Sequence, residues 1–593
     1  LGGQIDPENP FSYDVFNNFD STNKIENQGL SMQADYDLGL ATLTSITSYR
    51  TTSLRTNQDS DFTSADLVSR NFNDTDLSTF TQEVRLTSNG ADNRFDWMIG
   101  GFFFDEKVEL ENEFFYGDDF RSYADLLSGG PAVLAGIEAF IGVPGGTLAG
   151  SGQGMTEEFG QDNTSWSVFG TLDFYATDRL TATIGVNYTD DQKDAYGRIT
   201  NTDVLSGLDL TQLGYTAVLA SLLSDLGVNI ADPASIGPFI FANPQIYAAL
   251  QGGAVGAAQN SAVNPFAALG PLQFLPPFLG FPNSVENGST SDSNTSYTLR
   301  LAYDVTDNIN VYGSYATGFK ASSWNLSRDS RPFPTDYTPS STIVDPVTQQ
   351  VVFQATPSPI TSAGLAVPNL VTGTRFAGPE EAEVFEIGLK GSFSQVAFNI
   401  ALFDQTIEGF QSNVFTGTGF ALANAGEQST KGVEWDVTWN PIDALTLGFA
   451  GTFLDPVYDS FVNSSTGDIS GSTPSGIPDL TTTVSFNYDF TVFDAMDSFV
   501  RADWQYVADT AFFDDGALEN ALIAPTNFSR EQNLVNASAG ITLSNGVGMS
   551  VWARNLLDDE YVSTAFPSVA QGGSVSGYPN QPRTYGVTVR MTF

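Results

Sequence analysis

The side chains that could do chemistry in this chain are carboxylates, guanidinium groups and aromatic rings, because the sequence contains no Cys and no His. Their absence excludes disulfides, thiol nucleophiles, Ser-His triads, and zinc or haem held by His. Carboxylate chemistry remains possible, but the usual enzyme constellations are missing. We therefore expect no catalytic residues and a protein that is not an enzyme.

The charge balance is strongly acidic, with 69 Asp and Glu against 23 Lys and Arg and a net charge of −46. Such a surface repels nucleic-acid phosphates, so we expect no nucleic-acid partner. Two interpretations of the acidity stay open. One is an acidic proteome or a saline habitat, and the other is an electrostatic preference for cationic or metal-bearing ligands.

The candidates for ligand binding are aromatic rings and cations in the segments 320–381 and 412–429. Stacking rings next to guanidinium groups suit an anionic aromatic chelate. The candidate substrate-binding residues are Trp324, Arg328, Arg331, Phe333, Tyr337, Phe415 and Phe420. The alternative is that these rings pack the loops against each other.

Two pairs of neighbouring carboxylates could hold structural calcium (Ca²⁺) through oxygen ligands. They are Asp118-Asp119 and Asp514-Asp515. The alternative is that they are solvated acidic loop tips. We expect no other cofactor and no dedicated metal site.

The element that frames these residues is the closing stretch 583–593. Tyr585, Val587, Val589, Met591 and Phe593 alternate there with polar or small residues. A strand with one apolar and one polar face separates two solvents, either a core and water in a sandwich, or lipid and a lumen in an outer-membrane barrel. No run of about 18 apolar residues exists to form a membrane-spanning helix.

The same alternation predicts about seventeen strands, arranged as pairs with short turns. The predicted strands are 28–38, 41–55, 77–89, 94–109, 164–176, 179–192, 293–304, 308–319, 382–394, 397–411, 430–440, 443–455, 480–490, 497–510, 532–543, 546–556 and 583–593. Long connections separate the pairs, which is typical of an all-β transmembrane antiparallel barrel with long extracellular loops. Residues 1–27 are predicted to be a leading loop.

The longest connection, 193–292, is apolar and rich in Phe, Pro and Gly. Leu210, Leu213, Val218, Leu222 and Leu226 have helix-like spacing within it. We expect a large extracellular insertion that packs on itself. The alternative is an exposed apolar patch for a partner protein or a hydrophobic substrate.

Several motifs together resemble the TonB-dependent outer-membrane receptors, particularly the sphingomonad-type ones. They are Thr81-Gln82-Glu83-Val84-Arg85-Leu86 followed by Phe95-Asp96-Trp97, the strand Tyr312-Gly313-Ser314-Tyr315-Ala316-Thr317-Gly318-Phe319-Lys320, the strand Glu386-Ile387-Gly388-Leu389-Lys390, the pair Asn424-Ala425-Gly426 and Lys431-Gly432-Val433-Glu434, and the final Ala553-Arg554-Asn555-Leu556 with Pro582-Arg583-Thr584-Tyr585-Gly586. Their order and spacing extend over about 80–593.

The resemblance implies a barrel of about 22 strands that encloses a plug. Counted back from the closing strand, residues 28–593 would supply about 17 of these strands, and the odd count predicts that the plug and about five strands lie outside this chain. The resemblance also implies an outer-membrane location. Tyr585, Val589, Met591 and Phe593 would then form the signal that the insertion machinery reads.

The resemblance further implies active import of a scarce nutrient, first a ferric siderophore, otherwise cobalamin or an oligosaccharide. The implied partners are outer-membrane lipid and lipopolysaccharide, the small-molecule or metal-chelate substrate, and the TonB-ExbB-ExbD complex, which would act through the missing N-terminal region. Two alternatives stay open: a surface-anchored barrel whose loops bind partner proteins, and a passive pore.

Overall fold

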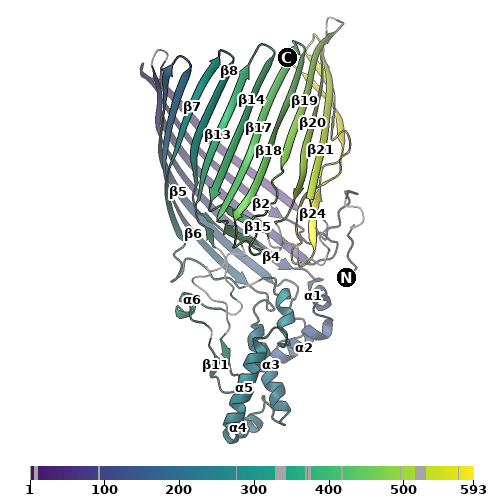
Figure 1. Ribbon diagram of the computed structural model, residues 1–593. Helices are drawn as coiled ribbons and strands as arrows, with labels where there is room; N and C mark the ends of the chain where they lie inside the picture. Colours follow the sequence, from purple (N-terminus) through teal and green to yellow (C-terminus); the bar gives the residue numbers. More distant parts are fainter. Residues whose placement is uncertain are drawn as a thin grey trace.

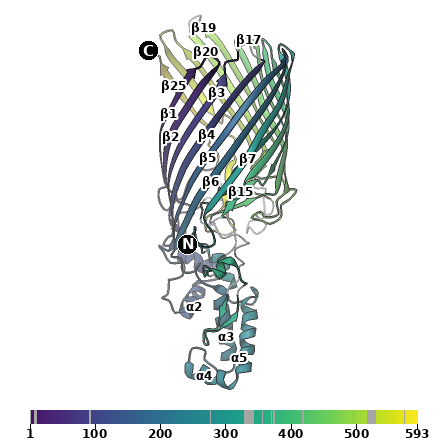
Figure 2. The same ribbon diagram turned by 90° about the vertical axis from the view of Figure 1, so that its left-hand side faces the viewer.

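A computed structural model describes residues 2–5, 11–90, 94–275, 277–327, 342–354, 356–367, 370, 375–415, 419–493, 496–514, 529–571 and 573–592. Its main feature is one curved antiparallel sheet of 17 strands, which forms the wall seen in Figures 1 and 2. The predicted fold class and strand count are confirmed. Within the described ranges, no hydrogen-bonded pairing joins the first strand of the sheet to the last.

The strands pair with their neighbours in chain order. They are β1 (Thr22–Asp37), β2 (Ala41–Asn57), β3 (Val68–Ser88), β4 (Phe95–Tyr116), β5 (Gly154–Thr177), β6 (Leu180–Asn201), β7 (Ser289–Thr306), β8 (Ile309–Lys320), β13 (Glu380–Ser392), β14 (Val396–Glu408), β17 (Glu427–Ile442), β18 (Leu445–Ser460), β19 (Leu480–Val492), β20 (Met496–Ala511), β21 (Ser529–Thr542), β22 (Val547–Arg554) and β25 (Thr584–Met591).

Several strands are longer than predicted, and the largest extensions lie at the long-loop end. β1 begins at Thr22, so residues 22–27 belong to a strand and the predicted leading loop is too long. β5 has 24 residues and β6 has 22, whereas a tilted strand crosses a bilayer in about 9–11 residues. The extensions of β5 and β6 were missed because apolar residues that pack against the loops, such as Met155, Phe159 and Ala195, stand among Gly and charged residues, which leaves no regular alternation of apolar and polar residues to detect.

In the described residues, four two-stranded sheets and seven helical segments lie at the long-loop end (Figure 1). These small sheets pair β9 (Ser323–Trp324) with β12 (Phe376–Ala377), β10 (Ile343–Val344) with β11 (Val351–Phe353), β15 (Gln411–Phe415) with β16 (Phe420–Asn424), and β23 (Val562–Pro567) with β24 (Val575–Pro579). The helices are α1 (Phe120–Leu127), α2 (Pro131–Ile141), α3 (Leu210–Ser224), α4 (Pro233–Ala242), α5 (Pro244–Ala258), η1 (Ala267–Leu272) and α6 (Pro359–Ser362).

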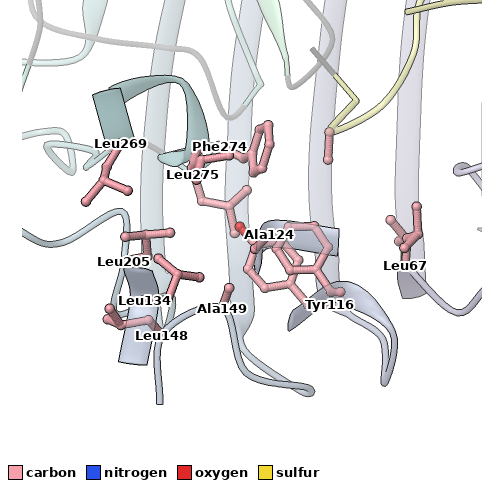
Figure 3. Close-up of a cluster of buried hydrophobic side chains, with 14 of the residues drawn as sticks. Leu67, Tyr116, Ala124, Leu134, Leu148, Ala149, Leu205, Leu269, Phe274 and Leu275 are labelled. Carbon is pink, nitrogen blue, oxygen red and sulfur yellow. The ribbon is translucent and has the colours of Figure 1, made fainter. Parts of the chain in front are cut away.

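Buried side chains tie α1 and α2 to the segments around them (Figure 3). The rings of Tyr116 and Phe120 stack at 3.6 Å, and Phe274 meets Phe120 edge-on at 5.9 Å. Leu134 from α2 and Leu205 belong to the same buried cluster. No single helix in the described ranges is long and apolar enough to cross a membrane. Helices α1 and α2 together have the length and apolar composition of such a span, but the chain bends by 98° between them.

Helices α3, α4 and α5 form an arm that projects beyond the barrel (Figures 1 and 2). The predicted helix within 193–292 is confirmed as α3, whose N-terminus is capped by the Asp209 side chain. Its buried face is Leu210, Tyr215, Leu219 and Leu223, whereas Leu226 lies beyond the helix and is exposed. The helix therefore buries a different face from the one that the spaced leucines indicated. Every side of this helix carries apolar residues, so their spacing alone does not identify the buried face.

The arm is built from two separate connections. Asp345, just after β10, is fully buried, and its Oδ2 accepts hydrogen bonds from the hydroxyls of Tyr215 on α3 and Tyr247 on α5. Both distances are 2.8 Å, and Gln251 Nε2 donates at the same distance. The carboxylate therefore joins the 342–353 segment to the helices of the 202–288 segment.

Candidate functional site

Trp324 lies on β9 at the long-loop end of the sheet. Its ring stacks on Phe281 at 5.4 Å, lies 5.2 Å from Phe376 of β12, and its Nε1 donates to the Thr290 hydroxyl at 3.1 Å. Phe281 in turn packs under the guanidinium of Arg375, which is buried and paired with Glu286 at 3.0 Å. These contacts show Trp324 packing two connections together, β6–β7 and β8–β13, which is the alternative that the sequence left open. A direct contact with substrate stays a prediction.

The remaining candidates of the 320–381 segment, namely Arg328, Arg331, Phe333 and Tyr337, lie outside the described residues. The two candidates of the next connection are both described. Phe415 ends β15 and Phe420 begins β16, and their rings lie 5.2 Å apart across the hairpin. Phe420 is 41% exposed.

A small cavity of about 340 Å³ lies between this hairpin and β9. Trp324 and Phe420 contribute rings to it, and Lys320, Asn325, Gln411 and Asn413 contribute polar groups. Its wall is held by hydrogen bonds from the Ser323 hydroxyl to Gln411 Oε1 at 2.6 Å and from Asn325 Nδ2 to the carbonyl of Phe420 at 2.7 Å. Cavities of this size, with rings and a few polar groups, are typical of small-molecule sites.

The hairpin also belongs to a larger group of rings at the same end, which we call the mouth cluster: Phe62, Phe415, Phe420, Phe566 and Tyr578. Phe415 meets Phe566 at 6.2 Å, Phe566 lies 5.9 Å from Phe62 and 5.6 Å from Tyr578, and Phe62 meets Tyr578 edge-on at 5.9 Å. The cluster thus unites three connections. Phe62, Phe566 and Tyr578 were missed from the sequence, because about 500 residues separate the first from the others, and only their presence in long loops gave any signal.

Phe62 has a left-handed backbone, with φ of 56°, which costs about 1–3 kcal/mol for a residue of this kind. The neighbouring Asp61 is 1% exposed, and its Oδ2 accepts hydrogen bonds from the backbone N–H groups of Leu67 at 3.2 Å and Val68 at 2.9 Å. Burial, with a smaller effect from the Asp59 carboxylate, raises the pKa of Asp61 to about 6. Gln571 Nε2 donates to the Asp61 carbonyl at 3.0 Å, so this loop is linked to the β23–β24 connection.

The acidic pairs proposed for calcium already have protein partners. Asp118 accepts a hydrogen bond from the Ser151 hydroxyl at 2.5 Å, and Asp119 accepts one from the Asp66 backbone at 3.1 Å. Asp514 accepts from the Ser475 backbone at 3.0 Å, and Asp515 lies outside the described residues. In the part of the chain that is described, no three acidic side chains form a group that could hold a metal ion. Calcium in these loops stays a prediction.

The predicted insertion signal lies on β25. Tyr585, Val589 and Met591 are 81%, 62% and 57% exposed, and Val587 shares their face, while Phe593 lies outside the described residues. Thr588 on the opposite face accepts a hydrogen bond from Trp552 Nε1 of β22. The strand therefore has the predicted apolar and polar faces. Its role in insertion stays a prediction.

A sequence model of the family described as "TonB dependent receptor-like, beta-barrel" matches residues 2–556 of the chain. The chain belongs to this family. The resemblance expected from the motifs is confirmed, and the sphingomonad type stays a prediction. TonB-dependent receptor barrels are outer-membrane proteins, so the apolar outer face of the sheet meets lipid and the polar face lines the lumen.

Solved TonB-dependent receptors have the same fold. The ferric yersiniabactin uptake receptor FyuA from Yersinia pestis matches with a TM-score of 0.59 at 14% identity, covering 97% of this chain and 62% of that one. The siderophore receptor PiuA from Acinetobacter baumannii matches with a TM-score of 0.56 at 14% identity, covering 96% of this chain and 64% of that one. The copper transporter OprC matches with a TM-score of 0.54 at 11% identity, covering 97% of this chain and 67% of that one. The chain thus spans less than two thirds of the length of FyuA and PiuA.

Proposed function

We propose that this TonB-dependent receptor barrel takes part in the import of a scarce nutrient across the outer membrane. A ferric siderophore is the first substrate class, ahead of cobalamin and an oligosaccharide. The proposal rests on the mouth cluster, which brings five rings from three connections to the long-loop end of the barrel. Of the proteins that share the fold, FyuA is a ferric yersiniabactin uptake receptor and PiuA is a siderophore receptor.

The chemistry of the mouth cluster favours a flat aromatic chelate over a sugar chain alone. Aromatic pairs contribute about 0.5–1.5 kcal/mol beyond the area they bury. The adjoining 340 Å³ cavity adds the ammonium of Lys320, which pairs with Glu380 at 3.3 Å and can also meet a ligand oxygen. The net charge of −46 favours a ligand that carries a metal cation.

The mechanism in this proposal involves capture and gating, with no covalent step. A chain without Cys and His lacks the thiol nucleophile and the imidazole base, and its family and fold relatives are transport receptors. Energy would come from the TonB-ExbB-ExbD complex acting on a plug supplied from outside these 593 residues. The polar lumen wall, with hydrogen bonds such as Tyr312 hydroxyl to Glu386 at 2.6 Å, would contact that plug.

A second candidate function is favoured by the tip of the arm. Phe241 on α4 is 90% exposed, and Leu226 and Ile246 are each about half exposed. An apolar tip of this kind is typical of surfaces that bind other proteins. In this alternative the barrel anchors the arm, and the mouth cluster only packs the loops.

Substitution of Phe420 by Ala tests the choice between these functions. The import proposal expects cells that depend on this receptor under iron limitation to bind and take up the iron-loaded chelate about tenfold less well, since about 1.4 kcal/mol corresponds to a factor of ten. Phe241→Ala on the arm is the matched control and should leave uptake unchanged. Normal uptake by Phe420→Ala, or loss only with Phe241→Ala, would contradict the proposal and favour the second candidate.

A further inference from the structure

Among the described residues, Arg375 has the largest side chain that is fully buried. It precedes β12 in the β8–β13 connection, and its Nε and Nη2 donate to the Glu286 carboxylate of the β6–β7 connection at 3.0 and 3.2 Å. Nη2 also donates to the carbonyl of Leu279. A buried ion pair is often no more stabilising than apolar side chains of the same volume. We therefore expect this pair to fix a geometry rather than to add stability.

The contacts of Arg375 lead to the wall of the 340 Å³ cavity beside β9. The guanidinium carbon lies 4.5 Å from the ring centre of Phe281, and Phe281 stacks on Trp324 with 14° between the ring planes. The Arg375 carbonyl accepts the N–H of Asn325 at 2.7 Å. Trp324 and Asn325 both line the cavity. Because Arg375 is fully buried, it supports these two residues from behind and does not itself face the cavity.

The other end of this series of contacts is fixed to the barrel wall. Phe281 is buried and exchanges two backbone hydrogen bonds with Gly197 of β6, at 2.9 and 3.0 Å. A Cβ built at Gly197 would lie 2.6 Å from the Phe281 ring, so a larger residue there would push the ring away from the wall. Trp324 thus takes its position from β6 through Phe281. Arg375 keeps β9 against that ring, since its side chain contacts Phe281 and its carbonyl binds Asn325.

We propose that Arg375 is a positioning residue for ligand capture, which sets the place of Trp324 in the cavity wall without touching the ligand. The inference rests on the proposed import function. The guanidinium is a planar fork that bonds both oxygens of Glu286 and lies against an aromatic ring, and the ammonium of a lysine reproduces only part of this. A lysine at this position therefore changes the shape of the cavity although it keeps the charge.

Arg375→Lys tests the proposal in the purified receptor. Fluorine NMR of receptor labelled with fluorotryptophan reports the position of Trp324 without any ligand, and Trp324→Phe identifies its signal among those of the seven tryptophans. We expect Arg375→Lys to shift that signal and to bind iron(III) catecholate about tenfold more weakly, which is about 1.4 kcal/mol. Arg121→Lys is the matched control, since Arg121 also pairs with a buried acid, Glu138, at 2.6 Å. It should leave the signal and the affinity unchanged.

A second variant, Arg375→Met with Glu286→Leu, leaves no unpaired charge and so separates the position of Trp324 from the cost of a buried ion. It should give a folded barrel in a heat-modifiability gel, yet still shift the Trp324 signal and bind iron(III) catecholate weakly. An unmoved signal or normal affinity in either folded variant would overturn the positioning role alone, and loss of the folded barrel in both would reduce the pair to a structural one. Failure of the unaltered receptor to bind iron(III) catecholate would instead overturn the import of an aromatic chelate, and the role in capture with it.

Discussion

At the scale of single residues, the mouth of the barrel depends on buried carboxylates. Asp61 holds the loop that places Phe62 in the mouth cluster, although its environment disfavours the charged form. Phe62 keeps a left-handed backbone only because its surroundings impose it. Strain and a buried acid next to a group of rings are features found at ligand sites more often than in plain structural loops.

The raised pKa of Asp61 predicts a loop that is more stable in acid. Because the folded pKa of about 6 exceeds the unfolded value of 3.8, the stabilisation is complete below pH 3.8 and is lost as the pH rises through about 6. The protection of the Leu67 and Val68 amides against hydrogen exchange, taken relative to the intrinsic exchange rate at each pH, should therefore fall over that interval. Asp61→Asn should abolish this pH dependence, and Asp118→Asn, an exposed acid in the next connection, should retain it. A flat profile in the unaltered protein would disprove the assignment.

At the scale of elements, the arm depends on one carboxylate that links two distant connections. Burial alone would raise the pKa of Asp345, but hydrogen bonds from Gln251, the Thr348 backbone and the Tyr247 hydroxyl outweigh it and lower the pKa. The contribution of Asp345 to stability is therefore present above pH 3.8 and is lost as the pH falls below that value. The arm and the Asp61 loop thus respond to acid in opposite directions.

Asp345→Ala should loosen the arm and leave the barrel intact. The change leaves two tyrosine hydroxyls and two backbone N–H groups without their acceptor, at a cost of about 3 kcal/mol or more. Hydrogen exchange should rise in α3 and α5, while amides of β13 and β14 stay protected. Asp225→Ala, at the exposed C-terminal end of α3, is the control. Equal protection of the arm in both variants would show that the apolar contacts hold it alone.

At the scale of the whole molecule, the two faces of the sheet belong to different solvents. Along β25 the outward Val587 is 66% exposed, and the next residue, Thr588, faces the lumen. An Arg on the lipid face costs about 2–4 kcal/mol at the bilayer midplane, whereas the lumen accepts charge.

Val587→Arg should therefore reduce assembly into the outer membrane, and Thr588→Arg should be tolerated. The amount of heat-modifiable, folded barrel in outer-membrane fractions measures the difference. The pair is matched, because both substitutions add the same side chain to adjacent positions of one strand. Better assembly of Val587→Arg than of Thr588→Arg would reverse the assignment of the two faces.

Local alternation of apolar and polar residues by itself determined the all-β class, the strand count and the identity of the lipid face. The physical reason is that a strand in a membrane must present apolar side chains to lipid and polar ones to the lumen. Each strand therefore shows the alternation in its own sequence, whatever its neighbours are. The same reason explains the errors at the long-loop end. There neither face of the strands meets lipid, and Met155 and Phe159 of β5 and Ala195 of β6 pack against the loops instead. The alternation therefore disappears although the hydrogen bonding continues.

The candidate site was predictable only in part. Phe415 and Phe420 stood out as rings in a short connection, but their contacts with Phe62, Phe566 and Tyr578 depend on the way the curved sheet brings distant loops to one end. The Asp345 link likewise exists only between loops that the chain separates. Contacts of this kind follow from register and curvature, which tertiary structure alone decided.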